Sequence, residues 1–375
     1  MSKSAIAIED ENGPAFPETP QQITPAWMTW ALRRNYPAVE VLSVNVVDIM
    51  AATATKVRIK LTYDDAGAKA GLPPTMIVKG AFSKNVDDME HTFTSEMQGY
   101  RDIVSGIGLN TPLCYFAGKQ KKNPLMVLED LSAEGCVEGC VFGSVHVPLT
   151  FDQAASVLDS LAKMHARYWQ HPALADGGEF SWMLRTVSGW HWAYMQMVLQ
   201  PEKWASYIKL PRGAAIPYKL ASDPARIERA LEKQWAFHRS MPETLGHGDS
   251  HVANMYFNSK GGGLLDWEMR RCPWFHDFTY FLVSALDVVD RRKWEQALLQ
   301  FYLGRLKEYG VAASPSFDEA FYCYQRDALY GYVIFVTNGD GTQFWTEAAN
   351  STAAMRFAMA CEDHDSLALI ERAQR

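Results

Sequence analysis

The sequence predicts an α+β protein that folds into two lobes. Its 375 residues are enough for two lobes that share a cleft. Short stretches near the N-terminus alternate apolar and polar residues, as half-buried strands do, whereas residues 278–375 read as a series of packed helices. The hydrophobic share of 48% and the charged share of 21% are those of an ordinary globular protein.

The N-terminal part combines one helix signal with several strand signals. Residues 1–20 carry three prolines among acidic and small residues and are predicted to form a loosely held tail. Thr24 and Pro25 predict a helix start, because threonine can cap a helix and proline fits its first position; Asn35–Pro37 ends that helix. Short alternating or apolar stretches then predict strands over residues 41–47, 57–61, 76–79 and 124–131, with a helix over residues 86–103.

The C-terminal part is predicted to be mainly helical. After a glycine- and cysteine-bearing connection over residues 132–150, apolar positions repeat with helical spacing from Phe151 to about Gln170. His165 in this helix is interpreted as a hydrogen-bonded core histidine. Residues 172–240 mix helices and loops, and their tryptophans are expected to pack mostly in the core. These tryptophans are Trp182, Trp190, Trp192, Trp204 and Trp235.

Residues 245–268, LGHGDSHVANMYFNSKGGGLLDWE, carry the chemistry that the sequence suggests. A loop holds Asp249 and, five positions later, Asn254; a hairpin follows and ends on Asp266. This pattern predicts that the three side chains come together. One carboxylate can accept a proton, while an amide oxygen and a second carboxylate are hard ligands of the kind that Mg²⁺ prefers. The hairpin is predicted to have a glycine-bearing turn at Asn258–Gly263 and a second strand at Leu264–Leu265.

The order HGDxxxxN, apolar strand, DWE resembles the aminoglycoside phosphotransferase-like kinases, which include choline kinase-like and ecdysteroid kinase-like enzymes. The resemblance implies a two-lobed protein kinase-like fold, with a small N-lobe and its antiparallel sheet in residues 1–131 and a larger helical C-lobe in residues 132–375. It also implies that Asp249 is catalytic, because the matching residue accepts or positions the hydroxyl proton of the acceptor. Asn254 and Asp266 match the residues that hold Mg²⁺ on the nucleotide phosphates.

The same resemblance implies residues that bind ATP. Lys79 is assigned to the α- and β-phosphates, with Glu96 orienting it by an ion pair and Glu90 as a competing choice. The turn at residues 50–55 would cover the phosphates, but it lacks the glycines of the protein-kinase loop. Asp277 is expected to brace the catalytic loop through hydrogen bonds from backbone N–H groups. Adenine would lie at the hinge between the lobes, where the candidates are Met126, Val127, Leu128, Glu129 and Leu131.

These residues predict an ATP- and Mg²⁺-dependent phosphotransferase that acts on a hydroxyl group of a small molecule. The aromatic content of residues 172–240, where the resembled family places acceptor-binding helices, favours an apolar or aromatic acceptor. Choline-like or aminoglycoside cations are the alternative substrate class, since aromatic groups also bind such cations. A nucleotide-binding pseudokinase or regulatory module is the alternative function. Protein kinase activity lacks support, because the HRD, DFG and APE motifs do not occur.

Composition argues against other classes of protein. The net charge of −7, without a basic block, argues against nucleic-acid binding. No apolar run approaches the roughly 20 residues that span a bilayer, and the N-terminus lacks the apolar stretch of a signal peptide. The six cysteines form no CxxC pair, so reduced thiols and a cytoplasmic location are expected. The sequence leaves the identity of the acceptor, the preference between ATP and GTP and the oligomeric state open.

Overall fold

The chain forms two compact units, which are described separately. Unit 1 consists of Met1–Val141, Asn258–Lys260 and Leu264–Glu268, and unit 2 consists of Phe142–Phe257, Gly261–Gly263 and Met269–Arg375. An antiparallel sheet in unit 1 and many helices in unit 2 confirm the predicted α+β class. The predicted lobe ranges, residues 1–131 and 132–375, remain a prediction. The structure is a computed structural model that describes residues 13–50, 54–80, 82, 86–132, 139–186, 188–339 and 345–373.

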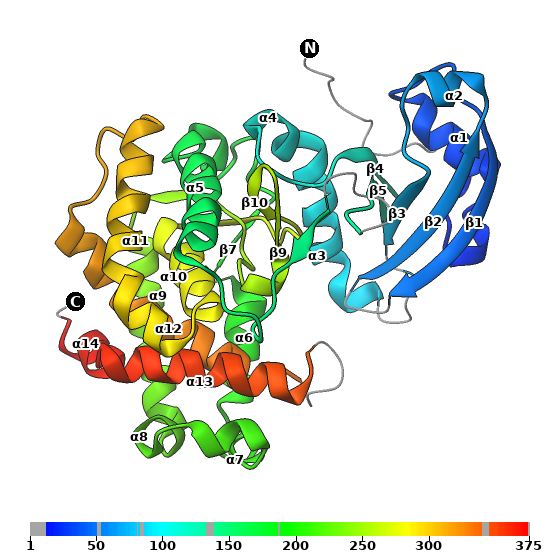
Figure 1. Ribbon diagram of the computed structural model, residues 1–375. Coiled ribbons are helices and arrows are strands. Elements are labelled where there is room, and N and C mark those ends of the chain that lie inside the picture. The colour runs from blue at the N-terminus through cyan, green and yellow to red at the C-terminus, as the bar shows by residue number, and fades with distance from the viewer. Residues whose placement is uncertain are drawn as a thin grey trace. The chain divides into compact units, whose positions relative to one another are not determined.

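Unit 1 is built on a five-stranded sheet with the order β1-β2-β3-β5-β4, in which every neighbouring pair is antiparallel (Figure 1). The predicted strands and helices are present, but the first two strands extend beyond their predicted ends, and the strand predicted over residues 124–131 ends at Glu129. Phe16, within the tail that is predicted to be loosely held, is buried in the core, and its N–H donates to the side chain of Gln120 at 2.8 Å. The strands are β1 (Val41–Met50), β2 (Thr55–Tyr63), β3 (Thr75–Gly80), β4 (Cys114–Gln120) and β5 (Asn123–Glu129). The helices are η1 (Pro20–Gln22), α1 (Pro25–Arg33), α2 (Asp65–Lys69), α3 (Val86–Gly99), the π-helical η2 (Tyr100–Val104) and α4 (Ser105–Ile107).

Helix α1 packs on the sheet and thereby shows which way Lys79 points. As predicted, Thr24 caps α1, and its hydroxyl accepts the N–H of Trp27 at 3.2 Å. The buried side chains of α1 share one apolar core with alternating residues of the strands, among them Val78 and Val127. Successive side chains of a strand point to opposite faces of a sheet. Lys79, which follows Val78, therefore points to the face away from α1.

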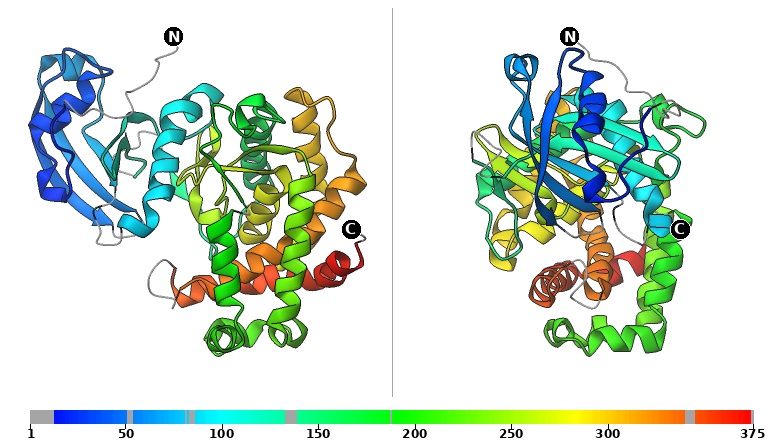
Figure 2. Two further views of the ribbon diagram at one scale, coloured as in Figure 1. Left: turned by 180° about the vertical axis from the view of Figure 1, so that it is seen from behind. Right: turned by 90° about the vertical axis from the view of Figure 1, so that its right-hand side faces the viewer.

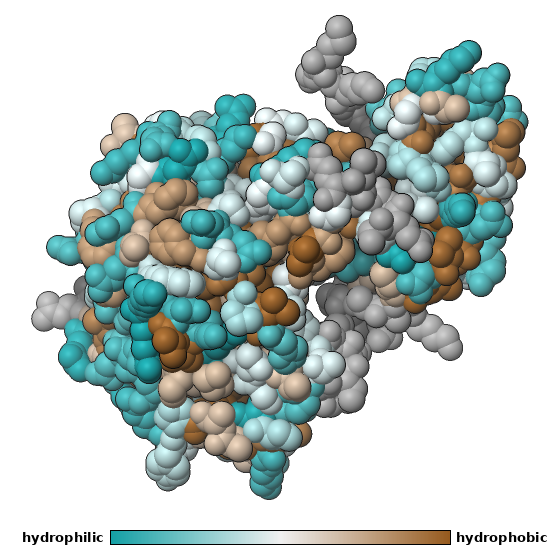
Figure 3. Space-filling model, in the orientation of Figure 1, coloured by the Kyte–Doolittle hydropathy of each residue, from teal (hydrophilic) through white to brown (hydrophobic). Residues whose placement is uncertain are grey.

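Strand β1 lies at an edge of the sheet, next to β2. Its outer side chains Leu42, Val46, Val47 and Ile49 are exposed, and Figure 3 shows apolar surface along this part of unit 1. The pairing of β1 with β2 shifts in register between Val46 and Asp48. Such an irregularity bends an edge strand, and it discourages the pairing of a further strand with the sheet.

Unit 2 is mainly helical, and α12 and α13 lie side by side in Figures 1 and 2. In the described part of the chain, no helix combines the length and the apolar character that a membrane span requires. The helices are α5 (Phe151–Arg167), η3 (Pro172–Leu174), α6 (Gly189–Val198), α7 (Pro201–Ile208), η4 (Pro211–Ala215), α8 (Tyr218–Ala221), α9 (Pro224–Ser240), η5 (Val252–Asn254), α10 (Trp274–Ala285), α11 (Val288–Glu308), α12 (Phe317–Thr337), α13 (Glu347–Asp363) and α14 (Ser366–Arg372). The remaining strands are β6 (Val141–Phe142), β7 (Leu184–Arg185), β8 (Glu243–Gly246), β9 (Met255–Asn258), β10 (Gly261–Leu264) and β11 (Arg270–Pro273), which form the sheets β10-β9-β6 and β7-β11-β8.

Two of the five tryptophans of residues 172–240 lie in the core, and Trp182 and Trp192 are half-buried. Trp204 and Trp235 are buried, and the indole N–H of Trp204 donates to the carbonyl of Ala221 at 2.8 Å. The ring of Trp192 lies 4.5 Å from that of Trp235 in an edge-on contact. The side chain of Trp190 lies outside the described residues. Their role as core residues is therefore confirmed for Trp204 and Trp235, and these two rings do not bear on the acceptor.

The hairpin after the HGD motif differs from its prediction. The turn occupies residues 259–260 only, and the three consecutive glycines lie in β10 rather than in the turn. The predicted hairpin is present, but its bounds differ: the turn is shorter than the predicted Asn258–Gly263, and the second strand is Gly261–Leu264 rather than Leu264–Leu265. Packing explains the difference: a Cβ on Gly263 would lie 2.3 Å from the ring of Tyr256, and one on Gly262 would lie 2.6 Å from Val157. These glycines allow a close approach and do not form a turn.

Candidate active site

Two lysines and two carboxylates form one charged cluster in unit 1. Lys79 donates to Glu96 at 2.6 Å and to one carboxylate oxygen of Asp266 at 2.6 Å. Lys56 donates to the other oxygen of Asp266 at 2.8 Å. Lys56 and Lys79 are direct cross-strand partners on β2 and β3, so their like charges would repel unless a carboxylate lay between them. Asp266 supplies that carboxylate, and α3 supplies Glu96.

The charges of this cluster stabilise one another. Burial alone would lower the pKa of Lys79, but the carboxylates of Asp266 and Glu96 raise it above its ordinary value. Burial would raise the pKa of Asp266, but Lys79 and Lys56 lower it well below the usual range. Burial raises the pKa of Glu96, although Lys79 acts in the opposite direction. Lys79 and Asp266 are therefore both charged at neutral pH, and Lys79 presents a fixed positive charge.

The backbone around Asp266 is held in an unusual conformation. Asp266 has a φ of 56°, in the left-handed region that aspartate tolerates better than most side chains do. Met269 also has a positive φ, of 40°. In unit 1 the hydroxyl of Ser95 donates to the carbonyl of Glu268 at 3.0 Å, which ties this segment to α3. Backbone strain of this kind concentrates at functional sites.

Glu96, and not its competitor Glu90, is the partner of Lys79. Glu90 forms a separate ion pair with Lys119 at 2.8 Å. Lys79 and Glu96 are each only 4% exposed, so their pair is shielded from water. Glu90 and Lys119 are both partly exposed. Since water screens an exposed pair, its contribution is smaller than that of a buried pair.

We therefore expect Glu96→Gln to weaken nucleotide binding by about tenfold or more, because it removes one partner of a buried ion pair and leaves Lys79 less well oriented. Glu90→Gln is the matched control, with an expected change below about twofold. Calorimetric titration with MgADP measures both. Equal losses in the two variants would show that Glu96 has no special role in nucleotide binding.

The predicted adenine-binding strand offers apolar side chains on the face to which Lys79 points. Met126 is the direct cross-strand partner of Lys79, so the two side chains lie on the same face. Leu128, two positions along β5, lies on that face as well. Val127 packs instead into the core on the side of α1. Of these three candidates, Met126 and Leu128 are therefore the ones whose side chains are on the face of Lys79.

The end of β5 determines which main-chain groups can reach a ligand. Strand β5 pairs with β3 on one side and β4 on the other, so the backbone groups within it are used in the sheet. The N–H of Glu129 donates to the carbonyl of Leu113 at 2.8 Å. Leu131, which is buried, is the candidate that follows the strand.

The predicted phosphate-covering turn at residues 50–55 falls partly on residues 51–53, which lie outside the described residues.

In unit 2, the loop after β8 holds Asp249 and Asn254. Gly248 turns the chain with a φ of 87°, which glycine adopts without strain. The amide group of Asn254 donates to the backbone carbonyl of Asp249 at 2.8 Å and to its carboxylate at 3.0 Å. The Nε2 atom of His251 lies 3.4 Å from the same carboxylate oxygen. Since the Asp249 side chain is still 41% exposed, it is oriented by two neighbours and yet open to a substrate.

The neighbours of Asp249 keep it ionised. The partial burial of Asp249 favours the neutral acid, but the imidazole of His251, together with His247 and the hydrogen bond from Asn254, lowers the pKa of Asp249 below its ordinary value. An ionised carboxylate accepts hydrogen bonds and has no proton to donate. At neutral pH Asp249 is therefore suited to accept or orient the proton of a hydroxyl group.

Asp277 braces this loop, as the sequence predicts. Its carboxylate accepts the backbone N–H of His247 at 2.6 Å and that of Gly248 at 3.1 Å. His165 is fully buried, with its Nε2 3.1 Å from Asp277 and its Nδ1 2.6 Å from the hydroxyl of Tyr302. The interpretation of His165 as a hydrogen-bonded core histidine is therefore confirmed. Burial would raise the pKa of Asp277, but His165 and the other nearby histidines lower it to about 2.

This lowered pKa predicts a pH dependence of stability. In the folded state Asp277 stays ionised down to about pH 2, whereas in the unfolded chain it takes up a proton below its ordinary pKa of about 3.9. Its contribution to stability is thus complete above about pH 4 and is lost as the pH falls toward about 2. Between about pH 5 and about pH 3, wild type should lose about 1 kcal/mol more free energy of unfolding than Asp277→Asn does. Urea unfolding at both pH values measures the difference, and equal losses would contradict it.

Asn254 and Asp266 offer oxygen atoms that suit Mg²⁺. Because the amide N–H groups of Asn254 are directed to Asp249, its amide oxygen is the atom that can face a cation. The carboxylate of Asp266 is ionised, and each of its oxygens accepts a hydrogen bond from a lysine. A metal ion at Asp266 would compete with Lys56 and Lys79 for these oxygens. Asn254 belongs to unit 2 and Asp266 to unit 1, and both donors are of the hard type that Mg²⁺ prefers.

Lys56 and His251 join these clusters although the sequence does not single them out. Lys56 meets Asp266 because the register of β2 and β3 places it opposite Lys79, and single-sequence patterns do not define strand register. His251 lies two positions after Asp249 in HGDSH. A polar ring that close to a candidate base is the one local signal that could have indicated it.

A buried lysine–glutamate pair under an antiparallel sheet, together with a helical unit that holds a braced HGDxxxxN loop, defines a kinase-like phosphotransferase. Residues 101–313, more than half of the chain, match the model of the APH family, described as the phosphotransferase enzyme family. The chain belongs to this family. The resemblance that the sequence suggested is thereby confirmed.

Solved structures similar to this chain come from the same range of enzymes. The choline kinase of Cryptosporidium parvum is 12% identical, with a TM-score of 0.49, and the match covers 91% of this chain and 95% of that one. The choline kinase LicA of Streptococcus pneumoniae is 16% identical, with a TM-score of 0.47, and the match covers 87% of this chain and 94% of that one. The aminoglycoside phosphotransferase of Streptomyces rimosus in complex with ADP and streptomycin is 12% identical, with a TM-score of 0.45, and the match covers 75% of this chain and 90% of that one. A comparison with curated proteins found no match.

Proposed function

We propose that this chain transfers the γ-phosphoryl group of ATP to a hydroxyl group of a small molecule. Membership of the phosphotransferase family supports the type of reaction. The observation that carries the proposal is the buried pair of Lys79 and Glu96, with Asp266 as a second partner of Lys79. A lysine held in this way is suited to the α- and β-phosphates of ATP. Met126 and Leu128, on the same face, would contact adenine.

Asp249 is the proposed catalytic residue. Its carboxylate would accept or orient the proton of the acceptor hydroxyl, whose oxygen forms a bond to the γ-phosphorus. The bond between that phosphorus and the bridging oxygen breaks, and ADP leaves. Positioning supplies much of the rate in such reactions, which agrees with the hydrogen bonds from Asn254 that orient Asp249.

Asn254 and Asp266 are the proposed Mg²⁺ ligands. Mg²⁺, when bound, neutralises charge that develops on the phosphates during transfer. Asp266 would supply a charged oxygen, and Asn254 a neutral one. Such unequal ligands predict unequal losses when each is removed, as discussed below. A cytoplasmic location, where MgATP is available, is part of the proposal.

The test is a screen of hydroxylated metabolites with MgATP, read out by mass spectrometry as a gain of one phosphoryl group. The panels are phenols, sterol-like alcohols, choline analogues and aminoglycosides. We expect turnover in the first two panels, because the proposed acceptor is neutral and apolar or ring-containing. Turnover confined to the cationic panels would overturn this acceptor class, and the absence of phosphorylated product in every panel would overturn the proposed activity.

A further inference from the structure

The two lysines of the charged cluster in unit 1 are held unequally. Lys79 is buried and donates to two carboxylates, those of Glu96 and Asp266. Lys56 donates to Asp266 at 2.8 Å, and its side chain is 27% exposed. Among the residues that the structure describes, Asp266 is the only ion-pair partner of Lys56. Because Lys56 is open to solvent and water screens its ion pair, Lys56 can exchange Asp266 for another anion more easily than Lys79 can.

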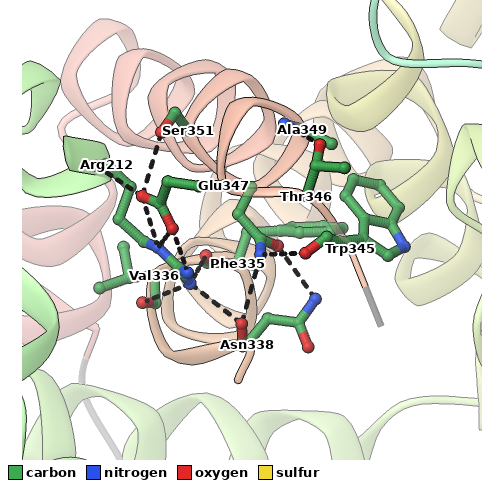
Figure 4. Close-up of polar contacts among 10 residues, drawn as sticks. Arg212, Phe335, Val336, Asn338, Trp345, Thr346, Glu347, Ala349 and Ser351 are labelled. Atoms are coloured by element: carbon green, nitrogen blue, oxygen red, sulfur yellow. Dashed lines mark hydrogen bonds and ion pairs between the residues drawn. The ribbon is translucent and has the colours of Figure 1, made fainter. Parts of the chain in front are cut away.

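An ion pair that serves the fold of this chain has a different environment. The guanidinium of Arg212 is fully buried and donates to both carboxylate oxygens of Glu347 in the first turn of α13. It also donates to the carbonyls of Val336 at 3.2 Å and Asn338 at 3.0 Å, and Figure 4 shows it between the ends of α12 and α13. Opening such a pair would leave buried polar groups without partners. The pair of Lys56 and Asp266 does not have this constraint.

The bond from Lys56 occupies an oxygen of a proposed metal ligand. One carboxylate oxygen of Asp266 accepts from Lys79, and the other accepts from Lys56. A divalent cation on this carboxylate would repel an ammonium group on the same side chain, so one lysine would have to give way. Lys79 is also held by Glu96, whereas Lys56 has no second carboxylate among the described residues. Lys56 and a metal ion would therefore compete for Asp266.

Lys56 is also placed to meet the phosphates of a nucleotide. It is the direct cross-strand partner of Lys79, so both side chains project from the same face of the sheet. The next residue along β2, Val57, packs into the core on the opposite face. While Asp266 and Glu96 hold both lysines, the formal charges of the cluster cancel. Once Lys56 leaves Asp266, its ammonium group on a flexible stem can bind an anion beside Lys79.

We propose that Lys56 is a second phosphate-binding lysine that competes with divalent cations for Asp266. Lys56 would hold Asp266 before MgATP binds and would exchange this carboxylate for a phosphate oxygen of the bound nucleotide. The exchange disfavours a divalent cation without nucleotide at Asp266, because Lys56 then has no phosphate to bind. This inference rests on the proposed function, since it places the phosphates at Lys79 and Mg²⁺ at Asp266.

The test consists of two binding measurements on the full chain, neither of which needs turnover. Mn²⁺ without nucleotide is titrated and followed by electron paramagnetic resonance. The Mg²⁺ complex of adenylyl imidodiphosphate, a non-hydrolysable analogue of ATP, is titrated by calorimetry. Lys56→Gln should bind free Mn²⁺ about threefold or more tightly than wild type, because it removes a competing cation. It should bind the ATP analogue about threefold or more weakly, because it removes a charged phosphate contact.

Three further variants assign these two effects to Lys56. Lys60→Gln is the matched control, because it removes an exposed lysine from the same face of β2; both affinities should stay within about twofold of wild type. Lys56→Arg keeps the charge, so it should bind free Mn²⁺ as weakly as wild type and recover much of the affinity for the analogue. Lys56→Gln combined with Asp266→Asn should lose the gained affinity for Mn²⁺.

The opposite signs of the two effects separate the proposed role from a structural one. A defect in folding would weaken the binding of both ligands, and that result in Lys56→Gln would overturn the inference. Equal or undetectable Mn²⁺ binding in Lys56→Gln and wild type would overturn the competition for Asp266, and unchanged affinity for the analogue would overturn the phosphate contact. Wild type that does not bind the analogue would instead overturn the proposed function, while the Mn²⁺ titrations would still decide whether Lys56 competes with a metal ion.

Discussion

Replacing Asp249 by asparagine is expected to lower phosphoryl transfer by about 10²–10⁴-fold. The variant keeps the shape of the side chain and a hydrogen-bond acceptor for Asn254, but it removes the negative charge that receives or orients the hydroxyl proton. Nucleotide binding should hardly change, because the charged cluster around Lys79 belongs to unit 1 and does not include Asp249. Single-turnover transfer and calorimetric affinity for MgADP together separate the two roles.

The control for this variant is Asp152→Asn, which neutralises an exposed aspartate in the first turn of α5. This change should weaken the interaction of residue 152 with the helix dipole and lower the free energy of unfolding by about 0.3–1 kcal/mol. Phosphoryl transfer should be unaffected. If MgADP affinity in Asp249→Asn fell as far as transfer did, Asp249 would be a nucleotide-binding or structural residue. The assignment of the catalytic role would then be wrong.

Asp266→Ala should abolish measurable turnover. The change removes the proposed charged Mg²⁺ ligand, and the loss of several kcal/mol of transition-state stabilisation corresponds to roughly 10³-fold or more in rate. It also leaves Lys56 and Lys79, which are cross-strand neighbours, without the carboxylate between them. Rates measured over a wide range of Mg²⁺ concentration should stay low throughout. Near-wild-type activity at saturating Mg²⁺ would remove Asp266 from the metal site.

Asn254→Ala provides the comparison for Asp266→Ala. It removes one neutral ligand rather than a charge, so the defect should be milder and should recover in part when Mg²⁺ is raised or replaced by Mn²⁺. Because Asn254 also donates to the carboxylate of Asp249, recovery should be incomplete. Full recovery would indicate that orientation of Asp249 by Asn254 contributes little.

Local signals predict much of this fold and site. The Thr24 cap is formed by side chains and backbone groups a few residues apart, so the sequence shows where α1 begins. The same holds for the alternation of β3, which places Lys79 and Val78 on opposite faces of the sheet. It also holds for the motif that gives Asp249 and Asn254 their spacing. In each case the interacting groups are neighbours in the chain, and a short pattern contains the necessary information.

Features that depend on distant partners could not be predicted from one sequence. The bond between Arg212 and Glu347 joins residues 135 positions apart, and Arg212 looks like an ordinary surface arginine in its local context. The ring contact between Trp345 and His251 also joins residues far apart in the chain, and no spacing rule predicts it from the sequence. Gly262 and Gly263 read as a turn, because the neighbours that require them, Val157 and Tyr256, are evident only from the packed structure.

Phosphorus NMR of MgATP incubated with the protein and the best acceptor from the screen tests the central claim most directly. The account predicts that the γ-phosphate signal disappears while ADP and a new phosphomonoester signal appear in equal amounts. The phosphomonoester should fail to form with Asp249→Asn. Unchanged ATP in the presence of protein and acceptor, or ADP with inorganic phosphate and no phosphomonoester, would contradict the transfer of a phosphoryl group to a hydroxyl.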